Sequence, residues 1–282
     1  MDWFTLSLIA MVLYGIQNFI YKIVAEKNLN TGLVLMTGFA TAGMLSGILL
    51  YLNFVPLTGI HIFVFAAIQA SFYLMSRYVK IESFKYLPTV VALPVSRTHF
   101  AITALLGIII LKEQYTLSTI LGIFLFLIVV LILSGSNAKK GITALNFRAG
   151  FALAVATAIF TTVSELMVKI AATQYNVLLF MFLSYVWLIL PSHLLNLRQG
   201  TNKRNKKPCI LYGFFIGLFN FASFFTVMSA LKTGPASVIF PVIGLNMLVT
   251  VFLAVIVYHE KITSRRLMAL ILSVLAIFLL RQ

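Results

Sequence analysis

The stretch that decides the fold of this chain occurs twice, as PTVVALPVSRTHFAITALLGIIILKEQYT at residues 88–116 and as PASVIFPVIGLNMLVTVFLAVIVYHEKIT at residues 235–263. Both copies begin with proline, continue with a second proline followed by valine, and end in Glu-x-x-Thr. Between these polar ends lies an apolar run of the length that a helix needs to cross a lipid bilayer. Each copy therefore predicts a transmembrane helix that ends at a glutamate.

The repeat extends beyond these two stretches. A shift of 147 residues also places Lys22 on Lys169 and Lys85 on Lys232. Polar residues are rare in this chain, so their coincidence at one offset indicates an internal repeat. We predict one five-helix repeat over residues 1–134, a linker over 135–146 and a second five-helix repeat over 147–282. An odd number of helices in each repeat gives the second copy an inverted topology.

The composition places nearly all of the chain in lipid. Hydrophobic residues make up 61%, charged residues only 10%, and the mean hydropathy is +1.06. These values predict an all-α integral membrane protein with ten transmembrane helices, arranged as two inverted five-helix repeats. We expect the first apolar run to be a retained helix, since no small-residue cleavage site follows it. The predicted spans are 3–25, 31–53, 60–79, 88–111, 116–134, 147–171, 176–197, 208–230, 236–258 and 263–281.

The chain is strongly basic, with a formal charge of +15 and a pI of about 10.1. In a soluble protein this excess of positive charge would suggest nucleic-acid binding. Here it is better explained by basic loops that contact anionic lipid headgroups. Most Lys and Arg fall in the loops that follow odd-numbered spans. The positive-inside rule places those loops in the cytoplasm and both termini outside.

Cofactor and metal chemistry are not expected from this sequence. A lone cysteine, Cys209, excludes an internal disulfide, and the four histidines lie on different segments without ligand spacing. The sequence also contains no phosphate-binding Gly-Lys-Ser loop, so it does not encode an ATP-driven pump. The six acidic residues are scattered, which disfavours a membrane enzyme.

The start of the first repeat adds Tyr14-Gly15 near the middle of the first span and then Tyr21-Lys22. Together with the two Pro…Pro-Val…Glu-x-x-Thr stretches, this pattern resembles the drug/metabolite transporter superfamily, specifically its EamA-type members. The resemblance implies secondary transport or exchange of a small solute through a central cavity. It also implies that both termini are cytoplasmic, which is the opposite of what the loop charges indicate.

Polar side chains inside the predicted spans are the candidates for a solute site, because each is costly in lipid. In the first span Tyr14, Gln17, Asn18 and Tyr21 share one helical face. This stripe either lines a solute cavity or forms a hydrogen-bonded seam between helices. The predicted substrate-binding residues are Tyr14, Gln17, Asn18, Tyr21, Gln69, Tyr73, Arg97, Glu165, Asn220, Phe224 and Asn246.

Glu165 is the one carboxylate well inside a predicted span. Burial makes such a group prone to take up a proton, so we predict either proton coupling or a contact with a cationic substrate. The alternative is an ion pair with Lys169 one helical turn away.

Arg97 follows Pro94 by three residues and breaks the internal symmetry, since its repeat mate is Gly244. It is predicted to bind a substrate carboxylate or phosphate, or alternatively to act as a structural clamp on backbone carbonyls or Glu82. His99 is interpreted as a packing residue. Pro94 and Pro241 are predicted hinges.

Glu113 and Glu260 are interpreted as structural carboxylates. Each ends one span and immediately precedes the next, and a helix N-terminus stabilises negative charge.

These features predict a secondary active transporter that moves a small metabolite or amino-acid-like solute by alternating access. Proton coupling through Glu165 is part of this prediction. A lipid scramblase or a lipid-modifying membrane enzyme is the alternative. We expect a multi-pass protein of a prokaryotic plasma (inner) membrane, acting as a monomer or homodimer, with membrane lipids and a small solute as its partners and no nucleic acid.

Overall fold

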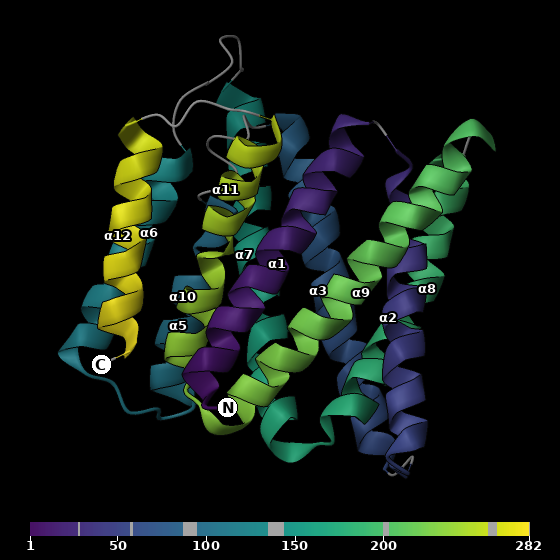
Figure 1. Ribbon diagram of the computed structural model, residues 1–282, viewed down its shortest axis with the longest axis horizontal. Coiled ribbons are helices and arrows are strands. Elements are labelled where there is room, and N and C mark those ends of the chain that lie inside the picture. Colours follow the sequence, from purple (N-terminus) through teal and green to yellow (C-terminus); the bar gives the residue numbers. More distant parts are fainter. Residues whose placement is uncertain are drawn as a thin grey trace. The chain divides into compact units, whose positions relative to one another are not determined.

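The computed structural model describes residues 1–27, 29–56, 59–86, 95–134, 144–199, 203–258 and 264–281. These residues form helices, without a strand in the described part (Figure 1). The helices are α1 (Trp3–Glu26), α2 (Thr31–Leu52), α3 (Ile60–Tyr86), α5 (His99–Ile110), α6 (Leu117–Ser134), α7 (Ala144–Gln174), α8 (Val177–Gln199), α9 (Lys203–Thr233), α10 (Ala236–Gly244), α11 (Asn246–Tyr258) and α12 (Ser264–Arg281).

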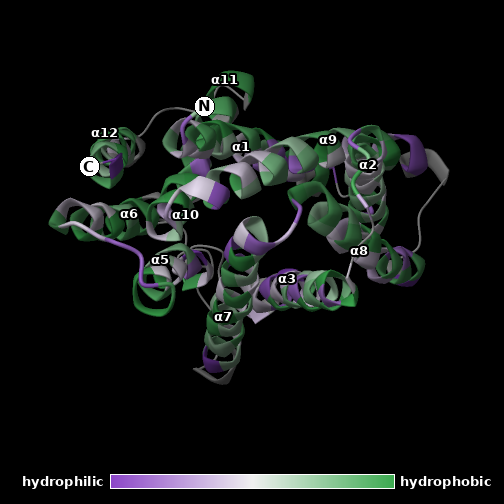
Figure 2. Cartoon of the chain, turned by 90° about the horizontal axis from the view of Figure 1, so that it is seen from below, coloured by the Kyte–Doolittle hydropathy of each residue, from purple (hydrophilic) through white to green (hydrophobic). Residues whose placement is uncertain are grey.

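Seven helical stretches of the described chain are long and apolar enough to cross a membrane, and Figure 2 shows that hydrophobic residues predominate along them. Three further apolar helices are shorter, at Val95–Ile110, Leu117–Ile132 and Leu267–Arg281. The protein is therefore an all-helical, multi-pass integral membrane protein. Each predicted span overlaps one of these helical stretches. The count of ten spans and the inverted repeat stay predictions.

The helices group into two compact units. Unit 1 comprises Met1–Ser71, Val168–Thr233 and Asn246–His259, and unit 2 comprises Phe72–Met167, Gly234–Leu245 and Glu260–Gln282. Both units draw helices from both halves of the sequence. Because they group helices by packing and not by chain order, they do not test the predicted boundaries at 134 and 147.

Within unit 1, α2 packs closely against α8 and α9. The contact between α2 and α9 is lined by glycine. A Cβ added to Gly217 would overlap the backbone carbonyl oxygen of Gly38, and one added to Gly213 would overlap the side chain of Thr37. Glycine therefore lets these two helices approach until their backbones touch, which is a common way for helices to associate in membranes.

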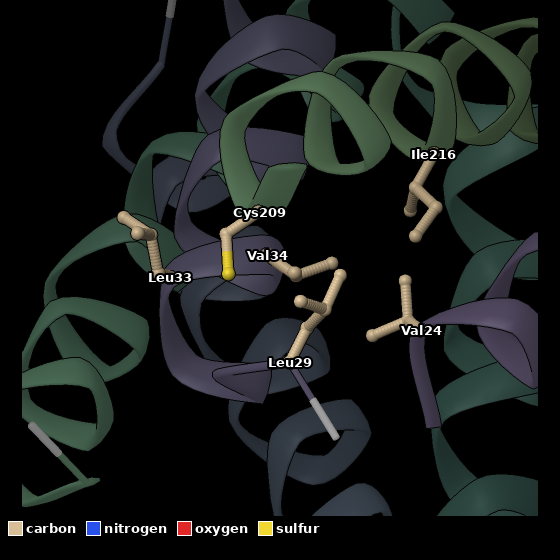
Figure 3. Packing of buried hydrophobic residues seen from close by; sticks show 6 residues of the cluster. All are labelled: Val24, Leu29, Leu33, Val34, Cys209 and Ile216. Atoms are coloured by element: carbon tan, nitrogen blue, oxygen red, sulfur yellow. The ribbon is translucent and has the colours of Figure 1, made fainter. Parts of the chain in front are cut away.

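One end of the same contact is filled by a buried hydrophobic cluster. Figure 3 shows its side chains, which come from α1, the α1–α2 turn, α2 and α9. Cys209 belongs to this cluster and is fully buried, so its thiol behaves as a small apolar group. The cluster consists of Val24, Leu29, Leu33, Val34, Cys209 and Ile216.

Unit 2 is built on two helix pairs, α6 with α12 and α5 with α10. Phe126 of α6 is fully buried and meets Phe100 of α5 edge-on, with ring centroids 5.9 Å apart. Both rings lie against Gly244, where a Cβ would fall 2.6 Å from Phe126 and 2.8 Å from Phe100. The end of α10 is thereby held against α5 and α6.

The ninth predicted span is broken in the structure. Helix α10 ends at Gly244 and α11 begins at Asn246, with Leu245 between them. The backbone N–H of Leu245 bonds to the carbonyl of Val242, which tightens the last turn of α10. Pro241, a predicted hinge, is buried inside α10 and precedes this break by four residues. Its hinge role stays a prediction, and the other predicted hinge, Pro94, lies outside the described residues.

Glu113 is positioned by the α5–α10 pair. Its two carboxylate oxygens accept hydrogen bonds from the backbone N–H groups of Ala236 at 2.7 Å and Ser237 at 2.9 Å, at the first turn of α10. The sequence predicted a carboxylate at a helix N-terminus, but it pointed to α6, the next helix along the chain. That partner was wrong, because the helix that Glu113 caps lies 123 residues away and only tertiary packing brings it near. Glu260, its repeat mate, lies outside the described residues.

We expect Glu113→Gln to destabilise the protein. An uncharged amide keeps one acceptor oxygen but loses the charge-assisted bond to the second free N–H of α10, which costs about 1–3 kcal/mol of unfolding free energy. The measurement is the melting temperature in detergent. Gln114→Ala, at the exposed neighbouring position, is the control. Equal melting temperatures for the two variants would contradict the assigned role.

Candidate functional site

The polar centre of unit 2 is built on Glu165, which lies on α7 inside the candidate span Phe147–Gln174. Its Oε2 atom accepts a hydrogen bond from the Thr103 hydroxyl at 2.6 Å and lies 3.1 Å from Nδ1 of His99. The side chains of His99 and Glu165 are only 13% and 15% exposed. A carboxylate, an imidazole and a hydroxyl therefore meet within the membrane-spanning part of the protein.

Helix α5 presents both partners of Glu165 on one face. His99 and Thr103 are four residues apart, which places them one turn apart on the same side of the helix. Thr162, three residues before Glu165, contacts the backbone carbonyl of His99 through its hydroxyl at 3.5 Å. The His99 ring also packs against Phe100, with centroids 3.9 Å apart. These contacts fix α5 and α7 so that the three side chains converge.

The contact between Glu165 and His99 can be made in two ways. When Glu165 is ionised, Thr103 donates to Oε2, and His99 donates through a protonated Nδ1. When Glu165 is protonated, its O–H donates to Nδ1 as an acceptor. The same hydrogen bond can thus be formed with the proton on either partner.

The sequence found Glu165 but not its partners. His99 was interpreted as a packing residue, whereas the structure pairs it with Glu165 across 66 residues of chain. Thr103 was not considered. The signal that could have found both is their spacing, since two polar residues one turn apart on an otherwise apolar helix form a polar face. Lys169, the partner in the alternative interpretation, donates to the carbonyl of Leu231 at 2.9 Å within unit 1.

Arg97 lies at the start of the helical stretch Val95–Ile110 in unit 2. Its Nη1 atom donates to the backbone carbonyl of Gly244, its repeat mate, at 3.3 Å. The carbonyl clamp that the sequence left open is thus present. A guanidinium carries five N–H donors, so a contact made through one nitrogen still leaves donors for another acceptor.

The polar stripe of α1 lies in unit 1. The side-chain amide of Asn18 donates to Oδ1 of Asn246 on α11 at 3.1 Å, and Thr250 donates to the carbonyl of Gly15 at 3.0 Å. A Cβ on Gly15 would fall 2.9 Å from the carbonyl oxygen of Asn246. These contacts match the alternative interpretation of the stripe, a hydrogen-bonded seam between helices. A cavity role for Asn18 and Asn246 stays a prediction.

A second group of predicted residues in unit 1 surrounds Tyr185 of α8. Its hydroxyl donates to the carbonyl of Asn220 at 3.3 Å, and its ring meets Phe224 edge-on at 6.0 Å. Asn220 is only 6% exposed. Tyr185 was not predicted, and nothing in its apolar surroundings in the sequence marked it out.

The predicted substrate residues divide between the units as follows. Unit 1 holds Tyr14, Gln17, Asn18, Tyr21, Gln69, Asn220, Phe224 and Asn246, while unit 2 holds Tyr73, Arg97 and Glu165. Gln17 and Gln69 are buried, each 4% exposed. That all eleven residues line one cavity stays a prediction.

The sequence and the fold of this chain are similar to those of known proteins. The family model of the EamA-like transporter family matches residues 148–282. An uncharacterized protein of Methanocaldococcus jannaschii is 31% identical over 132 residues, which make up 47% of this chain and 96% of that protein. The chain belongs to the EamA-like transporter family. It is accordingly a membrane transporter of small solutes, in a family of transporters and not of enzymes.

The fold is also found in a solved structure. A solved structure described as "Crystal structure of protein" matches 99% of this EamA-like transporter and 98% of its own chain, with a TM-score of 0.81 and 14% identity. At this identity the likeness shows the fold alone. It extends over the whole chain, including the first half that the family model leaves unmatched.

Proposed function

We propose that this EamA-like transporter is a secondary carrier that moves a small metabolite or amino-acid-like solute by alternating access, coupled to protons through Glu165. The observation that carries the proposal is the contact of Glu165 with His99 and Thr103 inside a membrane span. Ionisable residues at such positions are costly in lipid, and in pumps and transporters they form proton relays.

The charged surroundings of Glu165 favour a proton over a cationic solute. His99 is its titratable neighbour from α5, and Arg97 lies two residues before His99. Helix α10, which packs on α5, contributes no titratable residue. A cation that enters this unit would meet the positive charge of Arg97, whereas a proton taken up by an ionised Glu165 neutralises the carboxylate.

The length of the Methanocaldococcus relative supports alternating access between two repeats. That relative is about half as long as this chain, since its matched 132 residues are 96% of it. A five-helix unit of that size fits the predicted repeats, 1–134 and 147–282. Inverted repeats that rock against each other around a midplane site are a common carrier design.

The test begins with a thermal-shift screen of the purified protein against amino acids, polyamines, nucleosides and sugars, because a ligand that binds only the folded form raises its melting temperature. Each stabilising solute is then added to proteoliposomes that contain the protein and an internal pH-sensitive dye. We expect solute and proton to cross together. If the solute accumulates equally with and without a pH gradient, the protein is a carrier that is not coupled to protons.

The lipid alternatives are tested in the same vesicles. Fluorescent phospholipid that equilibrates between leaflets only when the protein is present would favour a scramblase, and a chemically altered lipid would favour an enzyme. If the lipid neither moves between leaflets nor is chemically altered, both lipid alternatives are excluded, and the solute measurement alone decides the carrier proposal.

A further inference from the structure

Helix α10 is held at both ends by charged side chains that flank α5. At the first turn of α10 the Glu113 carboxylate accepts hydrogen bonds from the N–H groups of Ala236 and Ser237. At its last residue the Arg97 guanidinium donates to the carbonyl of Gly244. Negative charge at the N-terminus and positive charge at the C-terminus both complement the dipole of a helix. Helix α10 is therefore fastened at both ends to the segment that contains α5.

Side-chain packing fastens the same two helices. All nine residues of α10 are buried. Where α10 begins, a Cβ added to Gly107 of α5 would lie 3.4 Å from the backbone nitrogen of Ser237. Where α10 ends, Gly244 lies against the ring of Phe100, and a Cβ there would fall 2.8 Å from the ring. A bend within α10, at Pro241 or elsewhere, would therefore disturb contacts at one of its two ends.

Helix α11, the second half of the ninth predicted span, is held by α1 in unit 1. Its first residue, Asn246, accepts the hydrogen bond from the Asn18 amide, and Thr250 one turn later donates to the carbonyl of Gly15. A Cβ added to Gly15 would overlap the side chain of Val249, so the two helices touch closely at this glycine. The start of α11 is thus fixed to α1, as α10 is fixed to α5.

Leu245 is the single residue between these two held helices. Its N–H bonds to the carbonyl of Val242, three residues earlier, so the regular α-helical ladder is interrupted here. Unit 2 includes this segment up to Leu245, and unit 1 includes it from Asn246 onward. In hinge motions a few residues at the ends of elements absorb the change in backbone dihedral angles. Any displacement between α10 and α11 falls on this residue.

We propose that Leu245 is the hinge of the ninth span. Helix α10 moves with α5, α11 moves with α1, and the backbone of Leu245 takes up the difference. The inference rests on the alternating access of the proposed function and deepens it by naming the joint. It also assigns a different role to Pro241, which lies inside a helix that is fastened at both ends and shapes that helix without bending it during transport.

The experiment measures distances between pairs of spin labels by double electron–electron resonance, on the full-length protein in lipid nanodiscs. One pair joins α5 to α11, with labels at Ile109→Cys and Phe252→Cys. The control pair joins α1 to α11, with labels at Val12→Cys and Phe252→Cys. These three side chains are exposed, whereas the native Cys209 is fully buried and out of reach of the label. Both pairs are measured in the wild type and in Glu165→Gln, whose neutral side chain resembles the proton-bound carrier.

We expect the α5–α11 distances, taken over both proteins, to spread over about 5 Å more than the α1–α11 distances, the scale of a shift by one helical turn. Equal and narrow distributions for the two pairs overturn the hinge, and solute uptake by the same protein would then leave the carrier function intact. A wide α5–α11 distribution in the wild type without proton-coupled uptake supports the hinge and removes the coupling.

Two variants decide between Leu245 and Pro241. Pro241→Ala restores an N–H that can bond to the carbonyl of Ser237, so it would stiffen a hinge at that position. Leu245→Pro fixes φ near the value of −72° that Leu245 already has, so it stiffens a hinge at 245. We expect only Leu245→Pro to narrow the α5–α11 distribution. Narrowing in Pro241→Ala, or none in a folded Leu245→Pro, overturns the proposal. If Leu245→Pro does not fold, Pro241→Ala decides by itself.

Discussion

Glu165→Gln is expected to uncouple solute movement from protons. Glutamine has nearly the same shape and still accepts a hydrogen bond from Thr103, but it cannot take up and release a proton. Proton-driven accumulation should therefore fall by about ten- to a hundredfold, the range of typical coupling free energies. Exchange of labelled for unlabelled solute, which needs no net proton movement, should persist and become independent of pH.

The measurement compares gradient-driven uptake with exchange in the same proteoliposomes. Asp2→Asn is the control, since it makes the same chemical change at an exposed carboxylate before α1. Loss of both activities in Glu165→Gln would indicate a folding or binding role for the carboxylate. Uptake with an unaltered pH dependence would show that protons do not pass through Glu165.

Gly217→Val is expected to have the largest effect on stability. The backbone of α9 touches that of α2 at Gly217, where even a Cβ would overlap the carbonyl of Gly38 and meet the Cβ of Thr41 at 2.7 Å. Backbone atoms cannot move aside as a flexible side chain would, so the helices must separate. Overpacking of this kind costs about 1–3 kcal/mol or more, and the widened contact also loses van der Waals packing between the helices.

The measurement is the melting temperature together with the fraction of protein that elutes as a single species from size exclusion. Gly43→Ala is the control on α2, because a Cβ there would make an ordinary contact of 3.4 Å with Tyr185. A stable, monodisperse Gly217→Val protein would show that the α2–α9 contact tolerates separation.

The positions of the helices followed from the sequence because apolar length alone determines what crosses a bilayer. The break at Leu245 could not be predicted, because one asparagine, Asn246, does not by itself interrupt a long apolar run. Contacts such as those of Gly244 with Phe100 and Phe126 accompany the break in the structure. The division into two units could not be predicted from the sequence either, since both units combine helices from distant parts of the chain.

Within the candidate site, the sequence could identify single polar residues but not the residues that contact them. Glu165 was predictable because a carboxylate inside an apolar span is conspicuous. The contact of Glu165 with His99 forms only because α5 and α7 lie close together. In the same way, Glu113 caps α10 only because α5 and α10 are packed against each other. Periodicity along one helix gives no information about which other helix faces it.

The bond between Arg97 and Gly244 joins two positions that are 147 residues apart, the same offset that relates the proposed repeats. In a twofold homodimer of single-repeat chains, equivalent residues near the axis face each other, so both would be arginine or both glycine. Two guanidinium groups would then repel, and two glycines would leave the carbonyl without this donor. In the proposed repeats, an arginine that faces the backbone of its counterpart therefore requires two halves of different sequence, which a single chain can supply and a homodimer cannot.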